Sequence, residues 1–245
     1  MLWGDFATDW QPVQAFGDHV PGRTFLAYAT AIWLIVSGAA LLRARTRRAG
    51  ALGLAIVYSV FAIFWLPRLY YVPHFFGFNL PRLIGVLDGL GQQVILVAAA
   101  TMVYQLQPAG NAREEPMLGS IAPIAFGLST IAFGVAHFTG LASVAPLVPA
   151  WLPFGAGFWA IVTGVAFILS GVAIVTRWLA ALGARLLALM LAIFSLLVWL
   201  PQLFKFPHEQ AAWGGNAYNL AAVGAALIVA GWCSSGQRPI KSGVL

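Results

Sequence analysis

A carboxylate inside an apolar segment is the most costly polar group in this sequence. Asp88 lies six residues after Arg82, which marks the outer rim of the span. At a rise of 1.5 Å per residue, Asp88 therefore lies roughly 9 Å along the helix from that rim. An unpaired carboxylate at that depth is strongly unfavourable or takes up a proton. Gln92 follows one turn later on the same face. One interpretation is a polar pocket in which Asp88 exchanges protons or anchors a ligand. The other is an ion pair that fastens a helix bundle, with Arg82, Arg68 or Lys205 as the cation.

The histidines form a second group of candidates. All of them fall near helix ends that hydropathy assigns to one side of a membrane, namely His19, His74, His137 and His208. A neutral imidazole can accept a proton from a quinol hydroxyl or bind a metal. Because a metal site needs several converging ligands and no HxxH or HxxxH pair is present, we expect no metal site. The histidines then either share a ligand site or merely cap helix ends and face lipid headgroups.

Tryptophans and amides gather on the same predicted side. Trp65 and Trp199 precede prolines that we expect to end helices, and Trp151 lies in an uncharged, proline-rich loop at 148–153. Such a loop folds back into the membrane interface, where it either roofs a cavity or joins an aromatic belt. Asn219 supplies a further amide near Gln92. The candidate ligand-binding residues are Asp88, Gln92, His74, His137, His208, Trp151, Trp199 and Asn219.

Composition determines what kind of chain positions these residues. The 245 residues are 61% hydrophobic and 8% charged, which excludes a soluble globule, a disordered chain and a fibrous protein. The mean hydropathy of +0.87 indicates an integral membrane protein, whose first partner is membrane lipid. The lone Cys233 excludes an intramolecular disulfide and a cysteine-based metal site. No nucleic-acid motif is present, and we expect no nucleic acid partner despite the net charge of +6.

The apolar runs predict seven transmembrane helices in an all-α fold. The turn between the first two spans holds Arg43, Arg45, Arg47 and Arg48, and such positive clusters stay in the cytoplasm. We therefore expect the N-terminus outside and the C-terminus inside. The predicted spans are 25–42, 49–66, 83–105, 118–138, 156–176, 178–200 and 216–234.

Two segments of the chain match each other. WLPRLYYVPH at 65–74 aligns with WLPQLFKFPH at 199–208, and five residues of the first span align with the fifth span one register away. The matched spans cross in the same direction, so the sequence predicts a parallel internal repeat. Residues 1–116 would hold an N-terminal interfacial segment and a three-helix unit, and residues 117–245 a four-helix unit. Chance matching of apolar residues is the alternative, and the aligned tryptophan, prolines and histidine argue against it.

The second unit resembles a known family. FGVAHF at 133–138, VPAWLP at 148–153, TGV at 163–165, a basic turn and a tryptophan-leucine-proline loop are similar to the DoxX-like membrane proteins. This sequence departs from the family pattern before the loop proline, where a histidine is expected and Trp199 is found. The resemblance implies a four-helix bundle unit, a bacterial cytoplasmic (inner) membrane, and an association with quinone-linked or thiol-related redox chemistry. It fixes the fold better than the activity.

Three functions fit the sequence. The first is a redox-associated subunit that binds a quinone or similar lipid-soluble molecule in an outer-side pocket and works with a redox partner protein. The second is a non-catalytic scaffold or partner subunit whose polar residues only hold the bundle together. The third is a small-solute carrier, and the expected lack of mid-membrane helix breaks argues against it. Whether the chain is itself an enzyme stays open.

Overall fold

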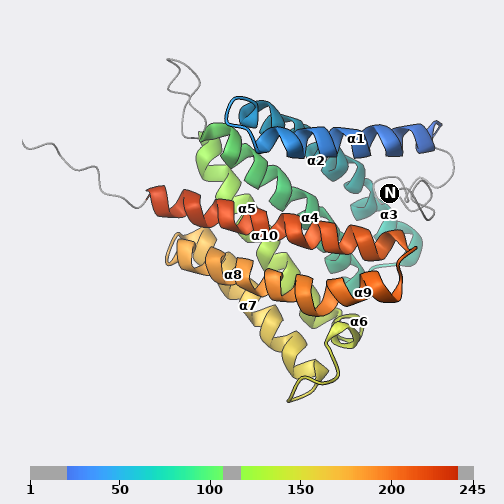
Figure 1. Ribbon diagram of the computed structural model, residues 1–245. Coiled ribbons are helices and arrows are strands. Elements are labelled where there is room, and N and C mark those ends of the chain that lie inside the picture. Colours follow the sequence, from blue (N-terminus) through green and yellow to red (C-terminus); the bar gives the residue numbers. More distant parts are fainter. Residues whose placement is uncertain (1–20, 107–116, 237–245) are drawn as a thin grey trace, which may run out of the picture.

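Long apolar helices make up nearly all of the structure (Figure 1). The computed structural model describes residues 21–106 and 117–236. Within these ranges, seven helical stretches are long and apolar enough to cross a membrane, which confirms the predicted number of spans. The helices are α1 (Arg23–Leu41), α2 (Arg47–Trp65), α3 (Pro67–Phe76), α4 (Leu80–Gln105), α5 (Met117–Thr139), α6 (Leu141–Val144), α7 (Ala156–Thr176), α8 (Ala180–Phe194), α9 (Leu200–Lys205) and α10 (Gln210–Gly236), with the 3-10 turn η2 (Ala145–Leu147) and the π-helical turn η3 (Ser195–Trp199).

Three predicted features fall outside the described residues. They are the N-terminal segment with His19, most of the connector at 106–117, and the basic C-terminal tail.

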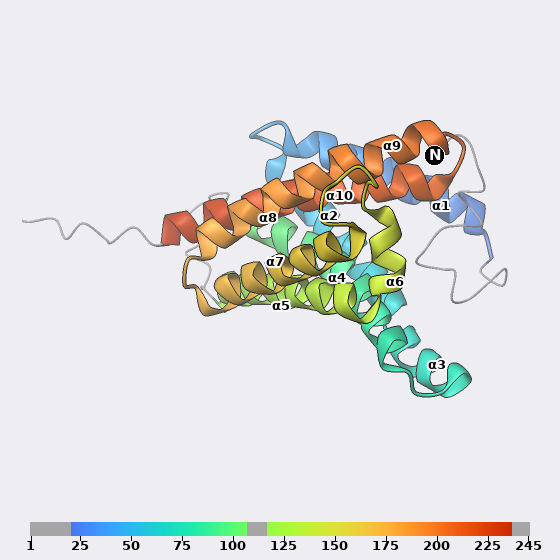
Figure 2. The ribbon, with the colours of Figure 1, turned by 90° about the horizontal axis from the view of Figure 1, so that it is seen from below.

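Five of the described helices form a closed ring. In the order α4, α5, α7, α8 and α10, each helix packs against the next, and α10 closes the ring by packing on α4. Helix α2 packs on the outside of α4, and α1 packs on α2. Helix α3 stands out from the bundle (Figure 2). The ring therefore takes α4 from the predicted three-helix unit and its other members from the predicted four-helix unit.

The prolines after the two repeated tryptophans end neither helical stretch. Helix α2 (to Trp65) passes through Leu66, which keeps helical φ and ψ, into α3, and α8 continues through η3 into α9, so the expected helix ends at Pro67 and Pro201 are wrong. Proline has no N–H to bond the carbonyl one turn earlier. In η3 the backbone N–H of Leu200 bonds the carbonyl of Ser195, five residues back, and this wider turn brings Pro201 into the first turn of α9, where the missing donor costs little.

Glycines set the distance between α5 and α7. A Cβ atom on Gly134 would lie 2.6 Å from the carbonyl oxygen of Gly164, and a Cβ on Gly171 would lie 2.5 Å from that of Gly127. Any larger residue would push the two backbones apart. Small residues allow this kind of close approach in membranes, where dispersion contacts replace the hydrophobic effect between helices.

Each repeated tryptophan lies over a glycine of a neighbouring helix. The Trp65 ring occupies the space that a side chain on Gly89 would need, and its Nε1 donates a hydrogen bond of 2.8 Å to the Val86 carbonyl. The Trp199 ring covers Gly215 of α10 in the same way. These contacts fasten α2 to α4 and η3 to α10.

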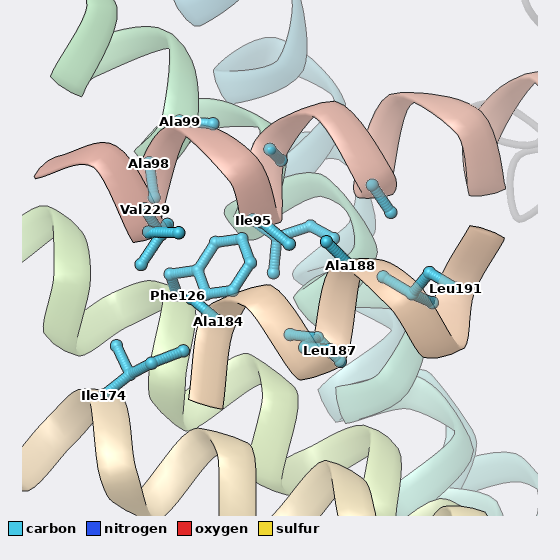
Figure 3. Close-up of a cluster of buried hydrophobic side chains, with 14 of the residues drawn as sticks. Ile95, Ala98, Ala99, Phe126, Ile174, Ala184, Leu187, Ala188, Leu191 and Val229 are labelled. Atoms are coloured by element: carbon cyan, nitrogen blue, oxygen red, sulfur yellow. The ribbon is translucent and has the colours of Figure 1, made fainter. Parts of the chain in front are cut away.

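One end of the ring is filled by a tightly packed apolar core (Figure 3). Ile95, Phe126, Ile174, Leu187 and Val229 come from the five different helices of the ring, and each is at most 2% exposed. Their side chains point toward one another in the close-up. This core fixes the relative position of the five helices.

The glycine under Trp65 gives a sharp test of this packing. We expect Gly89→Ala to lower the free energy of unfolding by about 1–3 kcal/mol, because the methyl group overlaps the indole and forces a shift. Gly85→Ala, one turn earlier on α4, is the control, since a Cβ there meets nothing within 4 Å. Thermal unfolding of the two variants in detergent measures the difference. Equal midpoints would contradict the close packing of Trp65 on Gly89.

Candidate functional site

A cavity of about 720 Å³ lies inside the five-helix ring. Ile95, Phe126 and Leu187 belong both to its wall and to the packed core, so the core forms one boundary of the cavity. Most of the remaining lining is aliphatic or aromatic. The polar side chains in the wall are Asp88, Gln92, Thr130, His137, Thr163, Tyr218 and Asn219.

Asp88 and Gln92 line the cavity together from α4. The Gln92 amide donates a hydrogen bond of 3.1 Å to Oδ2 of Asp88. Among the described residues no cation pairs with Asp88, so the structure does not show the ion pair that the sequence allowed. Arg68 and Arg82 instead donate to the backbone carbonyls of Phe64 and Phe76. The carboxyl group retains free lone pairs in an apolar surround, which makes it an acceptor for a ligand hydroxyl or proton.

His137 presents one ring nitrogen for further bonding. Its Nδ1 lies 2.8 Å from the carbonyl oxygen of Phe133, one turn earlier on α5. Because a carbonyl only accepts, Nδ1 carries the proton of the neutral ring and Nε2 keeps its lone pair. The imidazole is partly buried in the cavity wall, and its ring lies 5.1 Å from that of Phe167. Nε2 can therefore accept a hydrogen bond or a proton.

Tyr218 contributes a donor without a partner. Its hydroxyl is buried and makes no hydrogen bond among the described residues, although the ring lines the cavity. An unmade hydrogen bond of this kind costs about 1–3 kcal/mol. Asp88 lines the same cavity, so the two residues belong to the same polar region. Because the hydroxyl has almost no accessible surface, a ligand acceptor oxygen would restore the lost bond only after a local shift of the cavity wall.

Asn219 has a structural task beside Tyr218. Its Nδ2 donates to the carbonyl oxygen of Leu191 and to Oγ of Ser195, both at 2.6 Å. These bonds tie α10 to the point where α8 passes into the π-helical turn. Both amide protons are used, so only Oδ1 stays available to a ligand.

Aromatic rings form one wall of the cavity. Phe133, Phe167 and Phe194 come from α5, α7 and α8, with ring centroids 5.9 and 6.3 Å apart in succession. Trp199 lines the cavity beside them while it lies over Gly215. A flat conjugated ring gains favourable stacking energy against such surfaces.

An apolar loop closes the cavity at one end. Val148, Pro149 and Leu152 line the cavity from this loop, together with residues of α6 and η2. The indole of Trp159 donates a hydrogen bond of 2.7 Å to the carbonyl of Pro153 and thereby anchors the loop to α7. Of the two roles considered for the loop, the structure shows the roof. Trp151 itself is 71% exposed and does not line the cavity.

The structure brings together five of the eight predicted ligand-binding residues. Asp88, Gln92, His137, Trp199 and Asn219 line the one cavity.

His74 and His208 do not line the cavity. His74 lies on the exposed side of α3, stacked on Tyr70 at 5.3 Å, and His208 is exposed in the segment before α10. The expected shared site therefore contains one histidine among the described residues, because α3 stands out from the bundle and His208 lies in the exposed segment between α9 and α10.

No family model, curated protein or solved structure matches the chain. The site must therefore be interpreted from its own chemistry.

Sequence reasoning missed Tyr218, Thr130, Thr163 and Trp159. Tyr218 was overlooked because a tyrosine near the end of a span is typical of the membrane interface. Two signals could have found it. It directly precedes Asn219, and it lies three residues after Gly215, as Gln92 lies three after Gly89. The threonines donate to carbonyls of their own helices at 2.9 Å, a common way to hide a hydroxyl in an apolar helix.

The link between α10 and α8 can be tested through Asn219. We expect Asn219→Ala to lower the free energy of unfolding by about 1–3 kcal/mol, since it leaves the Ser195 hydroxyl without its partner and opens a void. Asn216→Ala, on the same helix but less buried, serves as the control. Chemical unfolding in detergent measures both. A loss no greater than that of the control would show that the two bonds do not hold the helices together.

Proposed function

We propose that this chain is a multi-pass membrane protein that binds a quinone, or a similarly lipid-soluble conjugated molecule, in the five-helix cavity. The observation that carries the proposal is that the Tyr218 hydroxyl, which has no hydrogen-bond partner, and the Asp88 carboxyl, which has no cation partner, belong to the wall of one largely apolar cavity among the described residues. Ligand pockets of about 300–1,000 Å³ with few polar groups are typical of small molecules of this size.

The polar groups match the two oxidation states of a quinone. Tyr218 can donate to a quinone carbonyl oxygen. Asp88 and Nε2 of His137 can accept from the hydroxyls of a quinol, and both can hold a proton. The phenylalanine wall suits the flat ring. The reduction of a quinone to a quinol needs two electrons and two protons. Asp88 and His137 would exchange the protons, and a redox partner protein would exchange the electrons.

The wider assignment follows from the sequence. We infer a DoxX-like protein of a bacterial cytoplasmic membrane, with the N-terminus and the cavity roof on the outer side. The two tryptophan–glycine contacts support the internal repeat, because Trp65 and Trp199 are the residues that the repeat aligns and each lies over a glycine of a neighbouring long helix.

A partner subunit without catalysis is the second candidate. The aromatic side chains of α3 and the following loop favour it, because Tyr70, Phe75, Phe76 and Phe78 are each at least 66% exposed on a segment that stands out from the bundle (Figure 2). Such a surface can bury itself against another membrane protein.

Tyr218→Phe separates a ligand-binding role from a structural one. Loss of the hydroxyl should raise the Kd for a short-chain benzoquinone about tenfold, equivalent to about 1.4 kcal/mol. The ligand-free protein should become no less stable, because the lost hydroxyl has no partner. Titration with the labelled quinone measures the first effect and thermal unfolding the second. Tyr28→Phe, on the exposed face of α1, is the matched control. Unchanged quinone affinity would contradict the proposed site.

Asp88→Asn tests the acceptor. The substitution keeps the shape and an oxygen for Gln92 but removes the charge, so the Kd for the corresponding quinol should rise about tenfold and that for the quinone less. Glu209→Gln is the control, because Glu209 is exposed and lies outside the cavity wall. Loss of folded protein from detergent extracts would instead assign Asp88 a structural role. Equal quinol affinity in folded Asp88→Asn and wild-type protein would contradict its function as an acceptor.

A further inference from the structure

Two residues of the cavity wall, on α7 and α8, also form part of the outer surface. Val162 and Ile193 both line the cavity, yet 38% and 44% of their surfaces are exposed. The wall is therefore thin at these residues, as it is at Leu147 of η2, which is 43% exposed beside the roof loop. We call the gap beside these two residues the side portal.

The helix register places both portal residues at one level. At the close contact of the two helices, Gly183 of α8 lies against Ser170 and Ala173 of α7. The helices are antiparallel, so moving about ten residues back along α7 and ten residues forward along α8 leads to Val162 and Ile193. The portal residues therefore face each other across the gap.

The two helices separate toward the portal. Figures 1 and 2 both show α7 and α8 meeting at their connecting turn and diverging toward their other ends. Near the turn, a Cβ on Gly183 would contact Ala173 at 3.0 Å. Further along, Phe167 and Phe194 still meet, with ring centroids 6.3 Å apart. Beyond this contact, the cavity wall continues with Leu197 and Val198 of η3, Trp159 of α7 and the roof loop.

The position of the portal points to the hydrocarbon region. Val162 lies six residues after α7 begins at Ala156, which is roughly 9 Å along the helix from its loop end. Both portal side chains are aliphatic, and so is Leu197 of the cavity wall beside them. We expect an opening with this aliphatic lining at this depth to face acyl chains.

We propose that the ligand is an amphiphile whose conjugated head occupies the cavity while its long apolar tail leaves through the side portal into the bilayer. This inference rests on the proposed function and adds the ligand class and its route. The head lies between Asp88, Tyr218 and the phenylalanine wall, and the tail passes between Val162 and Ile193. The ligand then loads from the lipid phase and not through the roof.

The test uses two labelled probes with one head group: a benzoquinone without a tail, and the same benzoquinone with an isoprenoid tail. Each is bound to the full-length protein in lipid nanodiscs. Val162→Trp and Ile193→Trp narrow the portal independently. Val165→Trp and Leu189→Trp are the matched controls, because both residues are exposed on the same two helices and do not line the cavity. We expect each portal variant to lose at least tenfold more affinity for the tailed probe than for the tailless probe.

The outcomes separate this inference from the proposed function. If the wild-type protein binds neither probe, the proposed function fails and the portal fails with it. If it binds both, and the portal variants lose both equally, the new indoles fill the cavity and the portal assignment is wrong. If the portal variants bind the tailed probe as well as the wild type does, the gap belongs to a phospholipid chain and the proposal is overturned. Retained binding of the tailless probe shows that a variant is folded.

Discussion

Close approach of helices at glycines is the constraint on which the rest of this structure depends. Where glycines of α5 and α7 face each other, the backbones nearly touch. The contacts of Trp65 with Gly89 and of Trp199 with Gly215 lock α2 on α4 and η3 on α10. Between α7 and α8 the described glycine contact occurs only at Gly183, near their turn. Glycine contacts thus hold α5 on α7 and η3 on α10 closely, whereas the one between α7 and α8 lies near their turn, away from the cavity wall at Val162 and Ile193.

Inside this ring, polar groups fall into two classes. The first class is satisfied within the protein: the threonine hydroxyls bond their own helices, and Asn219 bonds α8. The second class keeps unused hydrogen-bonding capacity, namely Asp88, Nε2 of His137 and the Tyr218 hydroxyl. A membrane interior has no water to supply the missing bonds. A protein that merely needed a stable bundle would be more stable with apolar residues at these three positions, so their presence favours a ligand.

The sequence was sufficient to predict the spans, because a membrane imposes a length and an apolar composition that few other constraints can produce. It also predicted that Asp88, Gln92, His137, Trp199 and Asn219 would lie together, and these five residues line the same cavity. It did not predict the continuation of α8 past Pro201, because the compensating π-helical turn depends on the bond from Leu200 to Ser195 and has no sequence pattern of its own.

The histidines show why common sidedness does not imply proximity. Hydropathy reports depth in the membrane but not the direction in which a helix end points. His137 stands on the inner face of α5, whereas His74 is carried away by α3, which leaves the bundle after Trp65. The position of α3 depends on Gly77, whose φ of 71° permits the reversal of the chain before α4. The direction in which α3 leaves the bundle cannot be derived from the spacing of residues in one sequence.

The two boundaries of the cavity differ in stiffness, and this difference bears on how a ligand exchanges. The roof loop contains two prolines, is held to α7 by the bond from Trp159 to Pro153, and joins α7 at Gly155 with a φ of 81°. Its opening would break that bond and expose apolar side chains. The side boundary consists only of aliphatic side chains on two helices that already diverge, and rotamer changes there are fast and break no hydrogen bond. For a ligand that partitions into lipid, the side route therefore has the lower barrier, and the fixed roof keeps water from the polar groups of the cavity.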